Sequence, residues 1–226
     1  MMQHNMMSWK KGLAALCLLA ITGLTGCDQK TDAVAQNVGY DGLSPNTPLR
    51  VDPQTRTVTM LVQVNGRFLT DDTRHGIVYK GGSNSQKSLF IGYATPKALY
   101  DALKQIHATP GDNMTMDNKE TTHVAGSKLA ISVTWAGAAK AYSFDDVIVD
   151  SNGRKPDMRF GGNLTAAEEK KTGCLLCLDS CPVGIISNAV YTYGAVEKRG
   201  EVKFTGNAAL LPPDGTLATV SFNVME

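Results

Sequence analysis

Residues 57–64 of the chain are Thr57-Val58-Thr59-Met60-Leu61-Val62-Gln63-Val64, a run of β-branched and apolar side chains that is typical of a strand. Asn65-Gly66 follows at once and is a turn signal. Two more strands are expected at residues 76–80 and 88–93, on either side of a Gly-rich loop at 81–84. The first half of the chain is therefore predicted to be a sheet of neighbouring strands.

One helix is predicted at about residues 95–107. Thr95 is a suitable N-cap, Pro96 fits the first turn, and apolar residues such as Leu99 and Leu103 recur at helical spacing. In the second half, strands are expected at residues 129–135, 142–149, 158–160, 185–193, 201–205 and 217–224. A short helical segment that bears cysteines is predicted at about 165–181. The predicted class is α+β with a predominantly antiparallel sheet.

Composition and motifs exclude several classes of function. The formal net charge is +1, and the chain has no clustered basic patch, so no nucleic-acid partner is expected. The sequence contains no G-x-S-x-G, phosphate loop or H-E-x-x-H motif. We therefore predict no catalytic residues, and a role other than that of an enzyme is favoured.

The first residues are predicted to be an export signal. Lys10 and Lys11 precede an apolar run at 12–24, which is shorter than the roughly 20 residues that a membrane-spanning helix needs. Leu24-Thr25-Gly26-Cys27 then resembles the lipobox of bacterial lipoproteins. This resemblance implies a signal peptide at 1–26, a diacylglycerol on the sulfur of Cys27, and palmitate on its new amino group.

The residues after Cys27 indicate where the protein is held. Asp28 resembles the signal that retains lipoproteins in the inner membrane, so we expect the periplasmic face of that membrane. Residues 27–50 are small and polar and are predicted to be a flexible tether, followed by a domain at 51–226. The expected partners are the membrane, through the lipid, and a protein in the same membrane.

Three cysteines of the predicted domain form a recognisable motif. Cys174, Cys177 and Cys181, followed by Pro182, have the spacing of the last three cysteines in the bacterial ferredoxin run. With the lipobox and the segments 75–78, 87–90, 98–103 and 160–163, this motif resembles the YdjY-like bacterial lipoproteins, which are described as ferredoxin-like. The resemblance implies a degenerate ferredoxin-type motif at 174–182 and no established activity.

An iron–sulfur cluster is one hypothesis for these cysteines. Against it, Lys171 occupies the position of the first ferredoxin cysteine, and the chain has no second cysteine run. The signal carries Lys10-Lys11 instead of two arginines, so the chain is expected to be exported unfolded, without a cluster assembled in the cytoplasm.

Other hypotheses remain open. A disulfide would join two of the thiols, since a helical turn would bring Cys174 and Cys177 within bridging range. The same two residues could be a thiol–disulfide exchange pair, with Asp179 opposing the thiolate. Zinc would take the three thiolates and a histidine, for which the candidates are His75, His107 and His123. Three functions follow: a redox or metal-binding accessory protein, a non-catalytic binding or assembly lipoprotein, and a thiol–disulfide oxidoreductase.

Overall fold

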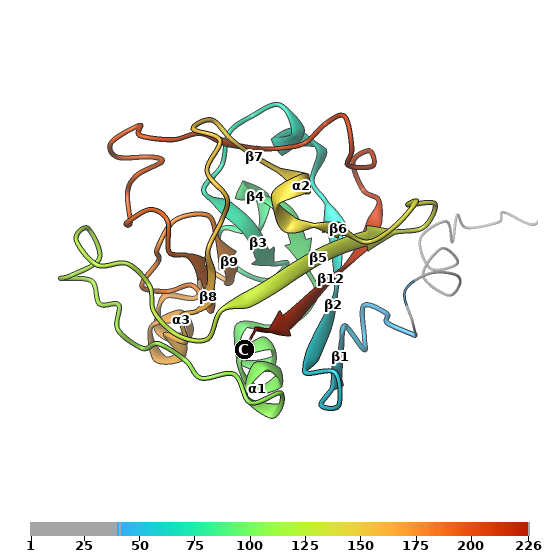
Figure 1. The fold of residues 1–226 in the computed structure, drawn as a ribbon, viewed down its shortest axis with the longest axis horizontal. Helices are drawn as coiled ribbons and strands as arrows, with labels where there is room; N and C mark the ends of the chain where they lie inside the picture. The colour runs from blue at the N-terminus through green and yellow to red at the C-terminus, as the bar shows by residue number, and fades with distance from the viewer. Residues whose placement is uncertain (1–39, 41, 226) are drawn as a thin grey trace, which may run out of the picture. The chain divides into compact units, whose positions relative to one another are not determined.

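The computed structural model describes residue 40 and residues 42–225, which form one large sheet, a small second sheet and short helices (Figure 1). The predicted signal peptide (1–26), the lipid-bearing Cys27, Asp28 and most of the tether lie outside these residues. The strands are β1 Leu49–Asp52, β2 Thr57–Val64, β3 His75–Tyr79, β4 Ser88–Gly92, β5 Leu129–Trp135, β6 Tyr142–Ser143, β7 Ile148–Asp150, β8 Met158–Phe160, β9 Cys174–Cys177, β10 Ile186–Asn188, β11 Phe204–Gly206 and β12 Leu217–Val224.

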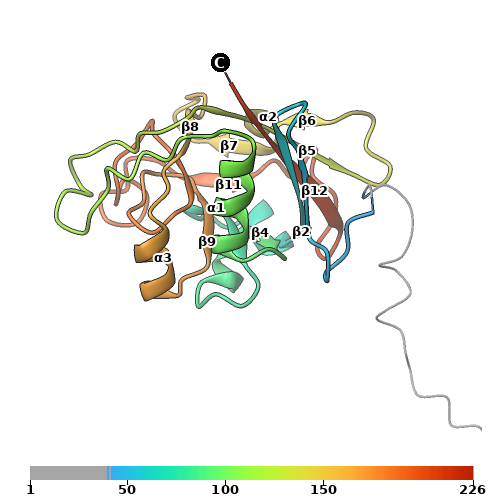
Figure 2. The same ribbon diagram turned by 90° about the horizontal axis from the view of Figure 1, so that it is seen from below.

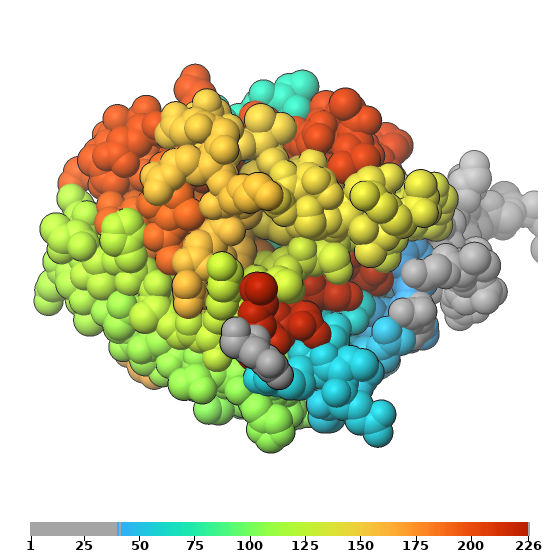
Figure 3. Space-filling model, viewed as in Figure 1, coloured from blue at the N-terminus to red at the C-terminus, as the bar shows by residue number. Residues whose placement is uncertain are grey.

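The large sheet has the strand order β6-β5-β12-β2-β4-β3-β9-β10-β8, and β1 also pairs with β2. At one end the C-terminal strand β12 lies between β2 and β5, with Val220 opposite both Met60 and Val133. In Figure 3 the red end of β12 accordingly emerges between the yellow-green β5 and the blue β1–β2 segment. β7 and β11 form the second sheet.

The predicted fold class is wrong, because the molecule is mostly β and its large sheet is mixed. β3 and β4 are parallel, and so are β9 and β10. With strands expected on either side of the Gly-rich loop at 81–84, a predominantly antiparallel sheet implies that these two strands run in opposite directions. Instead, the chain continues through the short 3-10 helix Ser85–Lys87 and re-enters the sheet in the same direction as β3. A turn motif indicates only that the chain reverses locally. The direction in which the next strand runs depends on the strands it pairs with, which can be distant in sequence.

The helices are α1 Pro96–Gln105, α2 Phe144–Val147 and α3 Leu164–Lys170, with a further 3-10 turn at Gly66–Leu69. α1 begins as its sequence indicates, because the Thr95 hydroxyl accepts a hydrogen bond from the amide of Ala98. Figure 2 shows α1 and α3 beside β9, and both helices pack on each other. Among the described residues, no helix has the length and apolar character to cross a membrane.

The cysteine-bearing segment is a strand, which corrects the prediction of a helical segment at about 165–181. Helix α3 ends because Lys171 and Gly173 both have positive φ angles, of 53° and 79°. The chain then enters the sheet as β9, between β3 and β10, and all four residues of β9 are buried. The segment at about 165–181 is rich in helix-forming residues, but its cysteine-bearing part is a strand in the middle of the sheet.

The chain is already packed before residue 51, where the domain was expected to begin. Leu43 is buried, and the hydroxyl of Tyr40 donates a hydrogen bond to the carbonyl of Leu217. β1 starts at Leu49, which is opposite Met60 of β2. The tether predicted for 27–50 thus includes residues that take part in the fold.

Candidate metal centre

Two irregularities in the pairing of β3 with β9 place two cysteines on one side of the sheet. In a regular strand, side chains three residues apart point to opposite faces. Here His75 is opposite Cys177 and Val78 is opposite Cys174, and the register shifts twice between these pairs. Such bulges redirect side chains and occur often beside functional sites. Cys174 and Cys177 can therefore face the same point in space.

The ligand atoms of three residues converge at that point. The imidazole Nδ1 of His75 lies 3.7 Å from the sulfur of Cys174. In the part of the chain that the structure describes, the ligand atoms of His75, Cys174 and Cys177 form the one group of this kind, and they all lie within 4.8 Å of one another. All three side chains are buried. Of the three candidate histidines, His75 is the one that the fold places beside these cysteines.

The third cysteine joins the same cluster from the loop after β9. Cys181 is buried in one cluster with Cys174, Cys177 and Val78, although its sulfur lies outside the group of three ligand atoms that are within 4.8 Å of one another. The loop is held in place because the amide of Asn163 donates to the carbonyls of Cys181 and Gly184, at 3.2 and 3.1 Å. All three cysteines predicted as site residues are thus brought together.

The other two candidate histidines lie elsewhere. His107 has a positive φ of 62° at the end of α1, and the Nδ1 of His123 lies 2.6 Å from the carbonyl of Ala189. Neither belongs to the cysteine cluster.

Two hydroxyl groups stand out beside the cysteines. Among the described residues, the buried side-chain oxygens without a hydrogen-bond partner are those of Thr172 and Ser187. Thr172 is close enough to the Cys174 sulfur to favour its thiolate form, and Ser187 is opposite Cys177 across the parallel β9–β10 pair. Buried hydroxyls normally find partners. A pair of unpartnered donors next to thiols fits sulfur atoms that carry negative charge, as they do on a metal ion.

A buried ion pair fixes the two segments that supply the ligands. Arg74 precedes His75, and Asp179 lies between Cys177 and Cys181. Nη2 and Nε of Arg74 donate to one carboxylate oxygen of Asp179, at 2.7 and 3.2 Å, and the other oxygen accepts from the amide of Gly194 at 3.0 Å. No sequence pattern predicts this pair, because its members are 105 residues apart. Asp179, expected to oppose a thiolate, is instead paired with a cation.

The protonation of the cluster suits metal binding. Burial and then the charge of Arg74 lower the pKa of His75, so its imidazole is neutral and has a free lone pair. The neighbouring thiols of Cys177 and Cys181 hold the pKa of Cys174 well below its ordinary value, and the reciprocal effect raises the pKa of Cys177. Burial raises the pKa of Asp179 to about 6 against the pull of Arg74.

These residues fit one metal ion and do not fit an iron–sulfur cluster. Tetrahedral zinc, with bonds of about 2.3 Å to sulfur and about 2.0 Å to nitrogen, places those two atoms about 3.5 Å apart. The observed separation of 3.7 Å between Cys174 and His75 is close to this value. A cluster needs ligands spread around several iron atoms, usually four cysteines. The ligand atoms of His75, Cys174 and Cys177, which lie within 4.8 Å of one another, have the spacing expected around a single ion.

The geometry also bears on the two thiol hypotheses. Cys174, Cys177 and Cys181 are all free thiols in the structure. Cys174 and Cys177 lie at the two ends of a strand, so the helical turn that favoured a disulfide between them does not exist. Exchange-active cysteines are partly exposed. Here the most accessible of the three is 1% exposed, which disfavours a thiol–disulfide oxidoreductase.

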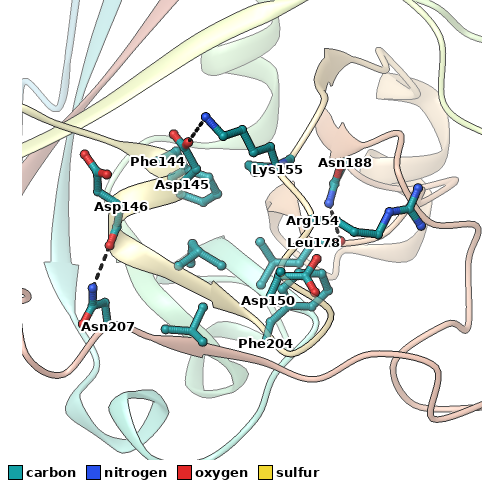
Figure 4. A pocket seen from close by; sticks show the side chains of 14 residues that line it. Phe144, Asp145, Asp146, Asp150, Arg154, Lys155, Leu178, Asn188, Phe204 and Asn207 are labelled. Carbon is teal, nitrogen blue, oxygen red and sulfur yellow. Dashed lines mark hydrogen bonds and ion pairs between the residues drawn. The ribbon is translucent and has the colours of Figure 1, made fainter.

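A cavity of about 370 Å³, lined by Leu178, Asn188 and Phe204 among others, is shown in Figure 4. Its charged and amide groups largely bond to the protein itself. Lys155 is 3.7 Å from Asp145, and the amide of Asn207 donates to the carbonyl of Asp146 at 2.9 Å. Asn188 donates to the carbonyl of Leu178 in the same way. This cavity gathers no cysteine or histidine, so the cysteine cluster is the stronger candidate site.

Comparisons with known proteins agree with the resemblance drawn from the motifs. The model of the YdjY domain matches residues 49–223. A protein of Escherichia coli strain K12, described as "Uncharacterized protein YdjY", is 76% identical over 226 residues, which cover 100% of both chains. No solved structure matches the chain. The chain belongs to the YdjY family.

Proposed function

We propose that Cys174, Cys177, Cys181 and His75 bind a single thiophilic metal ion, and that this protein is a metal-binding accessory lipoprotein. The observation that supports this most is the convergence of buried sulfur and imidazole ligands from β3, β9 and the following loop. A bound ion would cross-link these segments. The protein could also deliver the ion from this site to a partner. With all four protein ligands engaged, the site would be closed, as non-catalytic metal sites are.

Metal analysis tests this proposal. We expect the full chain, purified without oxygen, to bind close to one metal ion per molecule, and Co²⁺ in the site to show sulfur-to-metal charge-transfer absorption. Cys174→Ala and His75→Ala should lose the ion, whereas His123→Ala should retain it because His123 lies outside the cluster. Iron with inorganic sulfide, or no bound metal, would contradict the proposal.

We further propose that the protein is anchored by lipid to the periplasmic face of the inner membrane. Leu24-Thr25-Gly26-Cys27 and Asp28 support this. Two or more acyl chains would make the anchor stable. The membrane and a protein within it, to which metal would pass, are the partners that we infer.

The anchor can be tested by labelling cells with palmitate. The wild type and Cys17→Ala should incorporate the label and sediment with inner membranes. Cys27→Ala should do neither, because it lacks the sulfur that receives the diacylglycerol. Labelled Cys27→Ala protein, or unlabelled wild type, would show that the lipobox is not used.

A further inference from the structure

A cavity of about 240 Å³ reaches the cysteine cluster from the outside. Cys174 and Cys181 form part of its wall, together with Thr172, whose hydroxyl has no partner. The ligands themselves are at most 5% exposed. This cavity therefore gives an ion a route to the sulfur atoms that does not require the sheet to open.

Met116 lines the same cavity and differs from most large apolar residues of the protein. Its side chain is 50% exposed, whereas Met114, two residues earlier, is 6% exposed. The backbone around Met116 is held by reciprocal hydrogen bonds. The amide of Thr115 donates to the side chain of Asn118 at 2.7 Å, and the amide of Asn118 donates to the hydroxyl of Thr115 at 3.1 Å. These bonds hold the turn that carries Met116, and the Met116 side chain lines the cavity.

The lining of the cavity selects for a class of ion. No aspartate or glutamate lines it, so a hard divalent cation finds no oxygen anion there. Its cationic side chains are Arg74, whose charge is paired with Asp179, and Lys170. Zinc is bound by cysteine, histidine and carboxylate ligands, and not by methionine. A soft ion, by contrast, is bound by both thioether and thiolate sulfur, and Cu(I) is the biological ion that prefers them.

We propose that the ion bound by this site is Cu(I), and that the thioether of Met116 is the first ligand that Cu(I) meets on its way to Cys174 and Cys181. The inference rests on the proposed function, since it names the ion for the same site. The copper stays in one oxidation state throughout. Sulfur of Met116 is exchanged for thiolate sulfur, and the thiol protons pass to solvent.

The test measures the transfer of Cu(I) from a coloured chelator to the metal-free full chain, without oxygen and with a reductant present. We expect Met116→Leu, which keeps the size of the side chain but removes the sulfur, to slow transfer about tenfold. Its equilibrium affinity for Cu(I) should stay within about twofold of the wild type, because the final ligands are unchanged. Met114→Leu is the matched control, and its transfer rate should equal that of the wild type.

The outcomes separate this inference from the proposed function. Equal rates for Met116→Leu and wild type would overturn the role of Met116. A wild type that binds Zn²⁺ but not Cu(I) would overturn the choice of ion and leave the metal centre intact. A wild type that binds neither ion would overturn both. The rate of Zn²⁺ uptake should be the same in Met116→Leu and wild type, since zinc does not use the thioether, and slowing of both ions would point to altered structure and contradict the proposed role.

Discussion

Replacing Asp179 with alanine is expected to lower the free energy of unfolding by about 3–5 kcal/mol, because the change leaves the Arg74 guanidinium buried without its anion. The Arg74 side chain is 7% exposed and that of Asp179 is 0% exposed, so the position of the lost carboxylate is poorly accessible to water. The amide of Gly194 also loses its acceptor. Arg74 keeps its contact with the ring of Tyr193, 4.3 Å away, which does not compensate for a carboxylate. Denaturant unfolding at neutral pH measures the effect.

Two control variants test whether the loss of stability in Asp179→Ala comes from leaving the charge of Arg74 buried without a partner. The double variant Arg74→Met with Asp179→Leu removes both charges, and it should recover at least half of the lost stability because no charge remains buried alone. Asp101→Ala breaks an exposed ion pair with Lys97, in which the side chains are 47% and 60% exposed. This variant should lower the free energy of unfolding by no more than about 0.5 kcal/mol. A double variant as unstable as Asp179→Ala would refute the proposed role of the ion pair.

The sequence predicted those parts of the fold that depend on neighbouring residues. Thr95 and Pro96 mark the start of α1, and the β-branched run at 57–64 is strand β2. Parallel pairing was missed, because the partner of β3 is set by the whole chain and not by the loop that follows it. The helix expected across the cysteines was wrong for a similar reason. Burial between β3 and β10 overrides the helical preference of the residues beside Cys174.

The site was predictable only in part. The spacing of Cys174, Cys177 and Cys181 predicts three candidate ligands from the sequence alone. His75 was one of three candidate histidines, and only the pairing of β3 with β9 distinguishes it, since it places His75 opposite Cys177. Arg74 has no sequence signal at all, because its partner Asp179 lies in a segment that comes near it only in the folded chain. Local motifs supply the chemistry of such a site, and long-range strand pairing assembles it.

Removing the metal should weaken the fold, because the proposed ligands come from parts of the chain about 100 residues apart in sequence. An ion that binds only the native state stabilises it by about 4 kcal/mol when the free ion is at about 1,000 times its dissociation constant. A strong chelator should therefore lower the unfolding free energy of the metal-loaded wild type by about that amount. Excess metal should restore it.

Cys177→Ser provides the decisive comparison for this effect. Cys177 is fully buried and opposite His75, so its loss removes one ligand from the middle of the site while a side chain of similar size remains. The variant should be close in stability to the metal-free wild type, and the chelator should have no further effect on it. Thermal unfolding of both proteins, with and without chelator, separates the contribution of the ion from the cost of burying a hydroxyl. If chelation destabilises Cys177→Ser as much as the wild type, the stabilising ion is bound elsewhere and the cysteine cluster is not the metal centre.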